Sequence, residues 1–269
     1  MTDWLAVCRD CTEDIRGVLR SLPGRAEREP ILRRGQGGDD TTAIDHAAEE
    51  AVVRRLEATG ASFTLVSEEL GTRDFGAGGP STVVGDPIDG SVNAKRGIPF
   101  FAFSLAVAGG QTMGEVEFGY VYDFGTQEEW TAYRGGGAFL DGEALGAVRP
   151  KDEIEILSFE GTTTSAIVEW APAVIGHATR LRVLGSLALS LCHLAAGRVD
   201  AVCSLKPARS VDIAAAQLLV REVGLAIELP GAPPFAAAPL DLGQRSRVVA
   251  AGTPELVDAV ARALGERRR

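Results

Sequence analysis

Aromatic residues, cysteine and long apolar runs are all scarce in this sequence. Only 6% of the 269 residues are aromatic, four are cysteine, and the longest apolar runs have the length of a strand. Such short runs offer no membrane-spanning helix, and a secreted chain of this length would rely more on disulfide bonds. The N-terminus has neither a basic region nor a long apolar segment, so we expect no signal peptide and a cytoplasmic protein.

Positive charge is also in short supply. Lysine and arginine total 27 against 37 aspartate and glutamate residues, which gives a formal net charge of -10. This charge repels phosphate backbones and anionic lipid, so we expect neither a nucleic-acid nor a membrane partner. With 45% hydrophobic and 24% charged residues, the chain is able to form a full core, in one large domain or in two packed halves.

The cysteines are predicted to belong to the core. Cys8 and Cys11 form a C-x-x-C pair, but they recur within the apolar stripe of one amphipathic helix. A zinc site would need a second ligand pair, and Cys192, His193 and Cys203 lack the spacing for it. We expect His193 to be a packed residue of an apolar helix. The stripe comprises Trp4, Cys8, Cys11, Ile15, Val18 and Leu22.

The first half is predicted to contain two helices followed by an antiparallel sheet. The first helix covers residues 4–22 and precedes a polar stretch and a glycine-rich loop at 35–40. Asp40 or Thr41 is expected to cap a second helix that ends near Gly60. Strands rich in valine, phenylalanine and tyrosine are predicted at 62–67, 81–85, 102–108, 115–122 and 129–134.

The second half alternates strands and helices, which is typical of an α/β arrangement. Strands are predicted at 153–159, 181–184, 199–205, 225–229 and 245–252, and helices at 163–174, 186–196, 212–223 and from residue 253 onward. The boundary is expected near residues 142–151. We therefore predict an α+β subdomain over residues 1–146 and an α/β subdomain over residues 147–269.

The segment Asp86-Pro87-Ile88-Asp89-Gly90-Ser91 carries the strongest chemical signal. It places two aspartates at the end of an apolar strand, where Pro87 and Gly90 favour a turn. Carboxylates, the Ile88 carbonyl and the Ser91 hydroxyl are hard oxygen ligands of the kind that Mg²⁺ prefers. A helix starting at Gly90 or Ser91 would add an anion site. A simple β-turn, in which both aspartates accept backbone N–H groups, explains the segment equally well.

Three further acidic residues bear on this choice. Glu68 follows a predicted strand, Asp212 opens an apolar helix, and Asp45 lies on the helix after the glycine-rich loop. Glu68 and Asp212 could complete a carboxylate site with the aspartates of the turn. Each also has an ordinary structural explanation. Glu68 could be a solvated strand end, Asp212 a helix cap and Asp45 part of the polar face of its helix. Their spacing alone does not bring them together.

Two segments resemble the signatures of a known enzyme family. Residues 86–93, followed by Gly97-Ile98-Pro99-Phe100, resemble the first signature of the inositol monophosphatase superfamily of Mg²⁺-dependent, lithium-sensitive phosphatases. Residues 210–216, followed by Glu222-Val223-Gly224, are similar to its second signature. The runs at 67–71 and 93–99 are closest to the archaeal-type branch, whose members hydrolyse inositol phosphate, fructose 1,6-bisphosphate or both. The resemblance implies a layered αβαβα sandwich of α+β and α/β parts, with the metal site between the two halves, and a homodimer.

The resemblance also implies roles for particular residues. Ser91 stands where the family usually has threonine, and with Glu68 it would orient the attacking water. Val211 replaces a frequent tryptophan, and Leu205 stands where animal inositol phosphatases carry an acidic inositol contact, which leaves inositol specificity open. Arg34 could serve a phosphate-sensing loop or be an ordinary solvated arginine. The implied metal ligands are Glu68, Asp86, the Ile88 carbonyl, Asp89 and Asp212, with Asp45 at a third, weaker metal; the implied substrate contacts are Gly90, Ser91, Gly185 and Ser186.

The expected activity is therefore hydrolysis of a small-molecule phosphate ester by water, with two or three Mg²⁺ ions per site. No nucleophile motif or P-loop is present. The glycines at 35–38 neither follow a strand nor complete a dinucleotide-binding motif, which excludes that class of oxidoreductase. Two alternatives stay open, a 3'(2'),5'-bisphosphate nucleotidase and a catalytically silent metal-binding relative.

Overall fold

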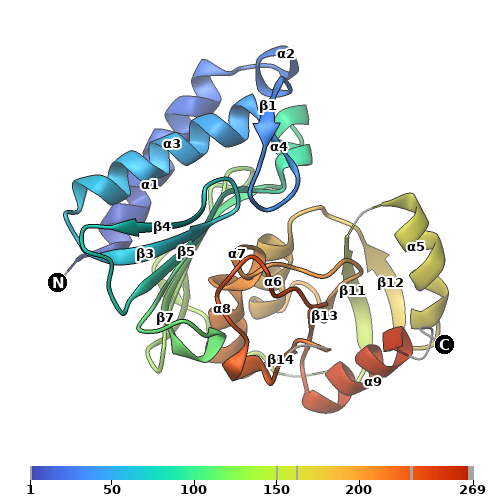
Figure 1. Ribbon diagram of the computed structural model, residues 1–269. Coiled ribbons are helices and arrows are strands. Elements are labelled where there is room, and N and C mark those ends of the chain that lie inside the picture. The colour runs from blue at the N-terminus through green and yellow to red at the C-terminus, as the bar shows by residue number, and fades with distance from the viewer. Residues whose placement is uncertain (1, 150, 162, 231–232, 266–269) are drawn as a thin grey trace.

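Two long helices pack together over one face of the larger sheet (Figure 1). The computed structural model describes residues 2–149, 151–161, 163–230 and 233–265. Helix α1 (Trp4–Ser21) buries Cys8, Cys11 and Ile15 against the sheet, as its apolar stripe predicts. All four cysteines are free and buried. Burial raises the pKa of the Cys11 thiol to about 12, so these thiols act as apolar core groups.

Helix α3 (Ala43–Ala58) begins later than the sequence predicts. Its N-cap is Thr42 rather than Asp40 or Thr41, because the Asp45 carboxylate accepts hydrogen bonds from both the Thr42 backbone N–H and its hydroxyl, at 3.0 and 2.6 Å. The region before it, predicted to be irregular, contains the short helix α2 (Arg25–Arg28) and a hairpin of β1 (Ile31–Arg34) and β2 (Asp40–Thr42). The glycine-rich segment is the loop of that hairpin.

The larger sheet has eight strands in the order β10-β9-β8-β7-β6-β5-β3-β4. The five predicted strands are all present, as β3 (Phe63–Ser67), β5 (Thr82–Asp89), β6 (Ala102–Ala108), β7 (Val116–Asp123) and β8 (Glu129–Tyr133). Three further strands were not predicted, β4 (Gly71–Phe75), β9 (Gly137–Leu140) and β10 (Glu143–Ala144), because β4 is polar in its middle and the other two are very short. The prediction of a purely antiparallel sheet is wrong at one pair, because β3 and β5 run parallel with β4 on the outer side of β3.

The smaller sheet has five strands in the order β12-β11-β13-β15-β14. Strands β12, β11 and β13 are parallel, whereas β15 pairs antiparallel with both of its neighbours. Their bounds are β11 (Ile154–Glu160), β12 (Ala178–Arg182), β13 (Ala201–Ser204), β14 (Ala226–Glu228) and β15 (Val249–Ala251). The strands predicted at 181–184 and 245–252 are thus displaced or shorter.

Helices complete five layers. Helices α6 (Leu187–Ala195) and α8 (Ala216–Glu222) lie between the two sheets, and α5 (Thr164–Trp170) and α9 (Pro254–Gly265) cover the far face of the smaller one (Figure 1). This order confirms the predicted αβαβα sandwich. Within the described ranges, no helix combines the length and the apolar character needed to cross a bilayer. The remaining helical turns are α4 (Ser91–Arg96), η1 (Met113–Glu115), η2 (Ala171–Val174), α7 (Ser210–Ile213) and η3 (Phe235–Ala237).

The helix predicted at 212–223 is broken in two, and the break lies against β7. Helix α7 ends at Ile213 and α8 starts at Ala216. Gly119 of β7 packs on the junction so closely that a Cβ at this position would lie 2.6 Å from the Ala215 carbonyl oxygen. The absent side chain therefore lets α7 approach the sheet, which matters because α7 carries Asp212.

We expect Gly119→Ala to destabilise the protein by about 1–3 kcal/mol, because the added methyl group clashes with backbone that cannot rotate away. The free energy of unfolding in urea measures the effect. Gly146→Ala is the matched control, since Gly146 is exposed and no atom of the described residues lies within 4 Å of its Cβ position. It should change stability by less than about 1 kcal/mol. Equal effects at both positions would contradict this account of the helix break.

Candidate active site

The end of β5 turns two carboxylates toward one cavity. Asp86 pairs with Ser104 of β6, and Asp89 pairs with Ala102. The chain therefore advances three residues on β5 but only two on β6, and β5 forms a bulge between Asp86 and Asp89. The Asp86 carboxylate accepts the Ile88 N–H at 2.9 Å, and Gly90 then takes a left-handed conformation with φ of 94°. The predicted turn is therefore real, and it leads directly into α4.

Glu68, Asp86 and Asp212 form a cluster that we call the carboxylate cage. One carboxylate oxygen from each residue lies within 4.8 Å of the other two. Glu68 and Asp86 are neighbours because β3 and β5 are parallel and their register pairs Ser67 with Gly85, so both strands end at the same edge. Asp212 comes from α7, which packs against β5. The fold thus brings together three residues that sequence spacing leaves apart.

Asp89 lies outside the cage and points toward the second half of the chain. Its Oδ2 accepts hydrogen bonds from the Ser186 hydroxyl at 2.5 Å and from the Ala188 N–H at 2.8 Å. Ser186 is also the N-cap of α6, where its hydroxyl accepts from the Leu189 N–H. Asp89 and Ser186, which sequence analysis assigned to metal and substrate, therefore join the two halves.

The predicted substrate turn lies directly against the first signature. A Cβ on Gly90 would be 3.1 Å from the Gly185 carbonyl oxygen, and Gly185 itself is left-handed, with φ of 91°. The Asn93 amide secures this contact by donating to the carbonyls of Leu184 and Phe100, both at 2.8 Å. Two glycines are needed here, because the two turns meet backbone to backbone.

The remaining predicted residues have defined local partners. The Ser91 hydroxyl donates to the Ile88 carbonyl at 2.9 Å. Asp45 uses Oδ2 for its helix cap, whereas its buried Oδ1 has no hydrogen-bond partner among the residues that the structure describes. Arg34 is exposed and donates to the Gly38 carbonyl within the hairpin. His193 stacks on Phe100 with ring centroids 5.6 Å apart, as expected of a packed residue.

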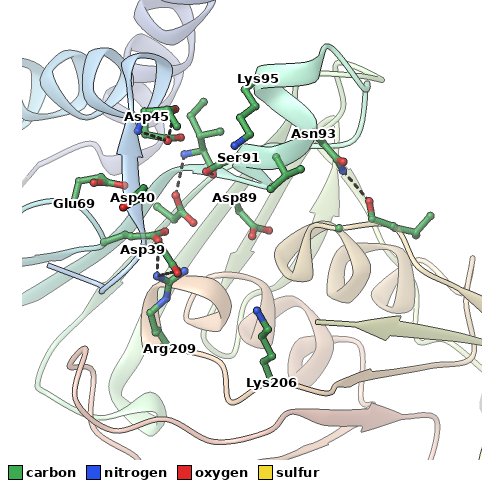
Figure 2. A pocket seen from close by; sticks show the side chains of 18 of the residues that line it. Asp39, Asp40, Asp45, Glu69, Asp89, Ser91, Asn93, Lys95, Lys206 and Arg209 are labelled. Atoms are coloured by element: carbon green, nitrogen blue, oxygen red, sulfur yellow. Dashed lines mark hydrogen bonds and ion pairs between the residues drawn. The ribbon is translucent and has the colours of Figure 1, made fainter. Parts of the chain in front are cut away.

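Asp45, Glu68, Asp86, Asp89 and Ser91 line a cavity of about 520 Å³ that is strongly acidic (Figure 2). A second cavity of about 410 Å³ adjoins it and shares five lining residues with it, Asp39, Asp89, Gly185, Lys206 and Arg209. Lys95 and Lys206 reach into the first cavity from opposite sides (Figure 2). Its carboxylates are those of Asp39, Asp40, Asp45, Glu68, Glu69, Asp86 and Asp89, and its cations are Lys95, Lys206 and Arg209.

Burial makes Glu68, Asp86 and Asp89 weaker acids than usual. It raises the pKa of Glu68 to about 8, with Arg209 acting in the opposite direction, and that of Asp89 to about 7. Burial, together with the charges of Glu68 and Asp89, raises the pKa of Asp86 well above its usual value. The cavity therefore gathers more carboxylates than can ionise without a cation. Several carboxylate oxygens, a nearby carbonyl and the unpartnered oxygen of Asp45 form a hard-oxygen donor set, which fits Mg²⁺, Mn²⁺ or Ca²⁺.

Comparison with known proteins agrees with this geometry. Residues 6–269 match the family model described as "Inositol monophosphatase family". The chain belongs to the inositol monophosphatase family. This membership confirms the predicted resemblance. Archaeal relatives named fructose-1,6-bisphosphatase/inositol-1-monophosphatase confirm its branch, and with them the chain is a phosphoric monoester hydrolase of sugar or polyol phosphates.

Relatives of the inositol monophosphatase family match along nearly the whole chain. A fructose-1,6-bisphosphatase/inositol-1-monophosphatase of Methanothermobacter thermautotrophicus is 33% identical and covers 97% of this chain and 96% of its own. Inositol monophosphatase 2 of Rattus norvegicus is 31% identical over 88% of this chain and 82% of its own. A crystal structure titled inositol monophosphatase-fructose 1,6 bisphosphatase superposes with a TM-score of 0.84, at 27% identity, covering 97% of this chain and all of that one.

Sequence analysis missed Arg209, whose guanidinium contacts Glu68, Asp212 and Asp39. One signal was available, because Arg209 precedes Asp212 by three residues and such pairs face each other in a helical turn. The contacts to Glu68 and Asp39, which lie 141 and 170 positions away, left no trace in local spacing.

A buried acid behind the cage affects stability rather than chemistry. Glu49 of α3 is 2% exposed and accepts the Ser67 hydroxyl at 2.6 and 2.7 Å. Burial raises its pKa from 4.5 to about 7, so the folded state keeps a proton that the unfolded state loses above about pH 4.5. The free energy of unfolding therefore falls as the pH rises from about 4.5 to 7. Above pH 7 the loss caused by the buried Glu49 charge is complete and stays constant.

Glu49→Gln should remove this cost, because an amide oxygen still accepts the Ser67 hydroxyl without a charge to bury. We expect the gain in unfolding free energy to be about 2 kcal/mol larger at pH 8 than at pH 5. Urea unfolding in chelator at the two pH values measures it. Glu57→Gln, on the exposed face of the same helix, is the control and should show no such pH dependence, because Glu57 pairs with Arg73, which stays charged at both pH values. A gain that is independent of pH would refute the ionisation argument.

Proposed function

We propose that this chain hydrolyses inositol monophosphate, fructose 1,6-bisphosphate or both, with Mg²⁺ as cofactor and a small-molecule phosphate ester as its only substrate class. The observation that carries the proposal is the carboxylate cage beside the Gly90-Ser91 turn. One carboxylate oxygen from each of its three members lies within 4.8 Å of the other two. The relatives named above carry those two activities in their names. The negative charge of the phosphate dianion is the main obstacle to the reaction, and cations held by a cage of this kind would neutralise it.

The chain's own residues would divide the work as follows. Glu68, Asp86, Asp89, Asp212 and the Ile88 carbonyl would hold two ions, and Asp45, with its unpartnered oxygen, would hold a weaker third. When bound, the ions neutralise the phosphate, lower the pKa of water and stabilise the leaving alkoxide. Glu68 and the Ser91 hydroxyl would orient the attacking water.

The backbone N–H groups of Gly90 and Ser91 would bind the phosphate, and the Gly185-Ser186 turn would contact the polyol. Lys95 and Lys206 extend into the cavity, where their charges favour an anionic ester (Figure 2). Leu205 is 3% exposed, so its position supplies no hydrogen bond to a polyol hydroxyl. This supports an inositol site that differs from the animal one.

We also propose that the site lies between two subdomains, residues 1–146 and 147–269. In support, the larger sheet ends at Ala144 and the smaller one starts at Ile154. Glu68, Asp86 and Asp89 come from the first part, and Asp212 comes from the second. Family membership further supports a cytoplasmic, lithium-sensitive homodimer, which sedimentation and inhibition by LiCl would test.

Phosphate release from a substrate panel tests the function. We expect turnover of myo-inositol 1-phosphate or fructose 1,6-bisphosphate with Mg²⁺ and none with chelator. Preference for adenosine 3',5'-bisphosphate would favour the nucleotidase, and no turnover of any ester at saturating Mg²⁺ would favour the silent relative.

Glu68→Gln should lower kcat by at least about 100-fold, because it removes both a ligand and the group that orients water. Steady-state phosphate release at saturating Mg²⁺ measures this. Glu57→Gln is the control, since Glu57 pairs with Arg73 on the surface and should keep kcat within about twofold. Full activity in the Glu68 variant would rule out the assigned site.

A further inference from the structure

Arg209 places a guanidinium directly on the carboxylate cage. Its side chain is 13% exposed and bonds to carboxylates from three separate segments (Figure 2). Nη2 lies 2.9 Å from Asp212 Oδ1, and Nη1 contacts Glu68 Oε1 and lies 3.3 Å from Asp39 Oδ2. Two of these three partners are members of the cage.

A guanidinium in this position offsets the cost of burying several carboxylates together. Burial lowers the pKa of Arg209, but Asp212 and Glu68 raise it further, so the side chain keeps its charge. Its fork of N–H donors bonds to two cage members at once. A divalent cation needs the same Glu68 and Asp212 carboxylates as ligands and would repel a guanidinium a few ångströms away. The two cations therefore compete for one site.

We propose that Arg209 is a built-in counter-ion of the cage, which balances Glu68 and Asp212 until a divalent cation binds and displaces it toward Asp39. The inference rests on the metal-binding part of the proposed function. Asp39 is suited to receive the guanidinium because its side chain is 77% exposed, lies outside the cage and already contacts Nη1. The displacement thus exchanges two partly buried partners, Glu68 and Asp212, for one exposed partner, Asp39.

The hairpin loop that carries Asp39 is built around this guanidinium. The Gly37 N–H donates to the Glu68 carbonyl at 2.8 Å, and Arg245 donates to the Gly37 carbonyl at 2.5 Å. A Cβ on Gly37 would lie 2.8 Å from Arg209 Nη1, so glycine leaves the room that the guanidinium occupies. The loop therefore keeps Asp39 beside Arg209.

The orientation of Asp212 does not depend on the Arg209 side chain alone. The backbone N–H of Arg209 donates to Asp212 Oδ2 at 2.7 Å, and any substituted residue other than proline retains this bond. Arg209→Met keeps much of the buried alkyl chain and removes the charge. The variant thus separates competition for the cage from support of Asp212.

Calorimetric titration with MgCl₂ alone, without substrate, tests the proposal. We expect Arg209→Met to bind Mg²⁺ about tenfold more tightly than the unchanged chain. Its Tm in chelator should be lower, because the cage has lost its counter-ion, and its rise in Tm on adding Mg²⁺ should be larger. Equal or weaker Mg²⁺ binding would overturn the proposal, since it would make Arg209 a supporting residue.

Asp39→Asn provides the second arm. It removes the negative charge that would attract the displaced guanidinium, so it should weaken Mg²⁺ binding several-fold in the unchanged chain and have little effect in the Arg209→Met background. If Arg209→Met does not fold, Asp39→Asn alone decides, and unaltered Mg²⁺ binding there overturns the proposal. The same weakening in both backgrounds would reflect general electrostatics and would overturn it too.

Arg245→Gln is the matched control, because Arg245 anchors the same loop through the Gly37 carbonyl rather than through a cage carboxylate. Its Mg²⁺ affinity should stay within about twofold of that of the unchanged chain. If this variant binds Mg²⁺ as tightly as Arg209→Met, then removing any nearby positive charge is enough to tighten binding, and the proposal is overturned. Mg²⁺ binding without hydrolysis of any ester would end the proposed function and leave this inference standing. Absence of Mg²⁺ binding by the unchanged chain would end both.

Discussion

The parallel pairing of β3 with β5 is the constraint on which the site depends. Parallel neighbours end at the same edge of a sheet, and the register that pairs Ser67 with Gly85 makes Glu68 and Asp86 the next residues on adjacent strands. Strand β4 permits this arrangement by pairing on the outer side of β3. With β4 between them, the two carboxylates would be about 5 Å further apart, too far to share one ion.

The second half of the chain completes the site through close backbone packing. Gly119 lets the α7–α8 junction approach β7, and this approach delivers Asp212 to the strand ends. Asp89 and Asn93 then bond to the segment at 184–188, so residues of the first signature themselves join the two halves. Stability and site geometry are therefore coupled, because a shift of one half would move cage carboxylates relative to one another.

Sequence patterns identified what is encoded locally. The periodicity of α1, the β-branched strands and the Asp86–Asp89 turn all depend on neighbours within a few residues, and the family signatures added Glu68 and Asp212. The hairpin before α3, the edge strand β4 and the break at Ala214–Ala215 escaped, because tertiary packing rather than local propensity produces them. Arg209 escaped for the same reason, since a counter-ion is defined by partners that only folding brings near.

The acidity of the chain and the anionic nature of its substrates are compatible only if the binding events are ordered. Carboxylates outnumber cations in the cavity, and one of its cations, Arg209, is already engaged by Glu68, Asp212 and Asp39. A phosphate dianion approaching this cavity meets net repulsion, whereas a divalent cation meets attraction. Once cations are bound, the sign of the local field reverses while the net charge of the chain stays negative. An ester that binds after the metal then finds a positive cavity on a chain with a formal charge of -10, so the overall charge helps to confine anionic ligands to the site.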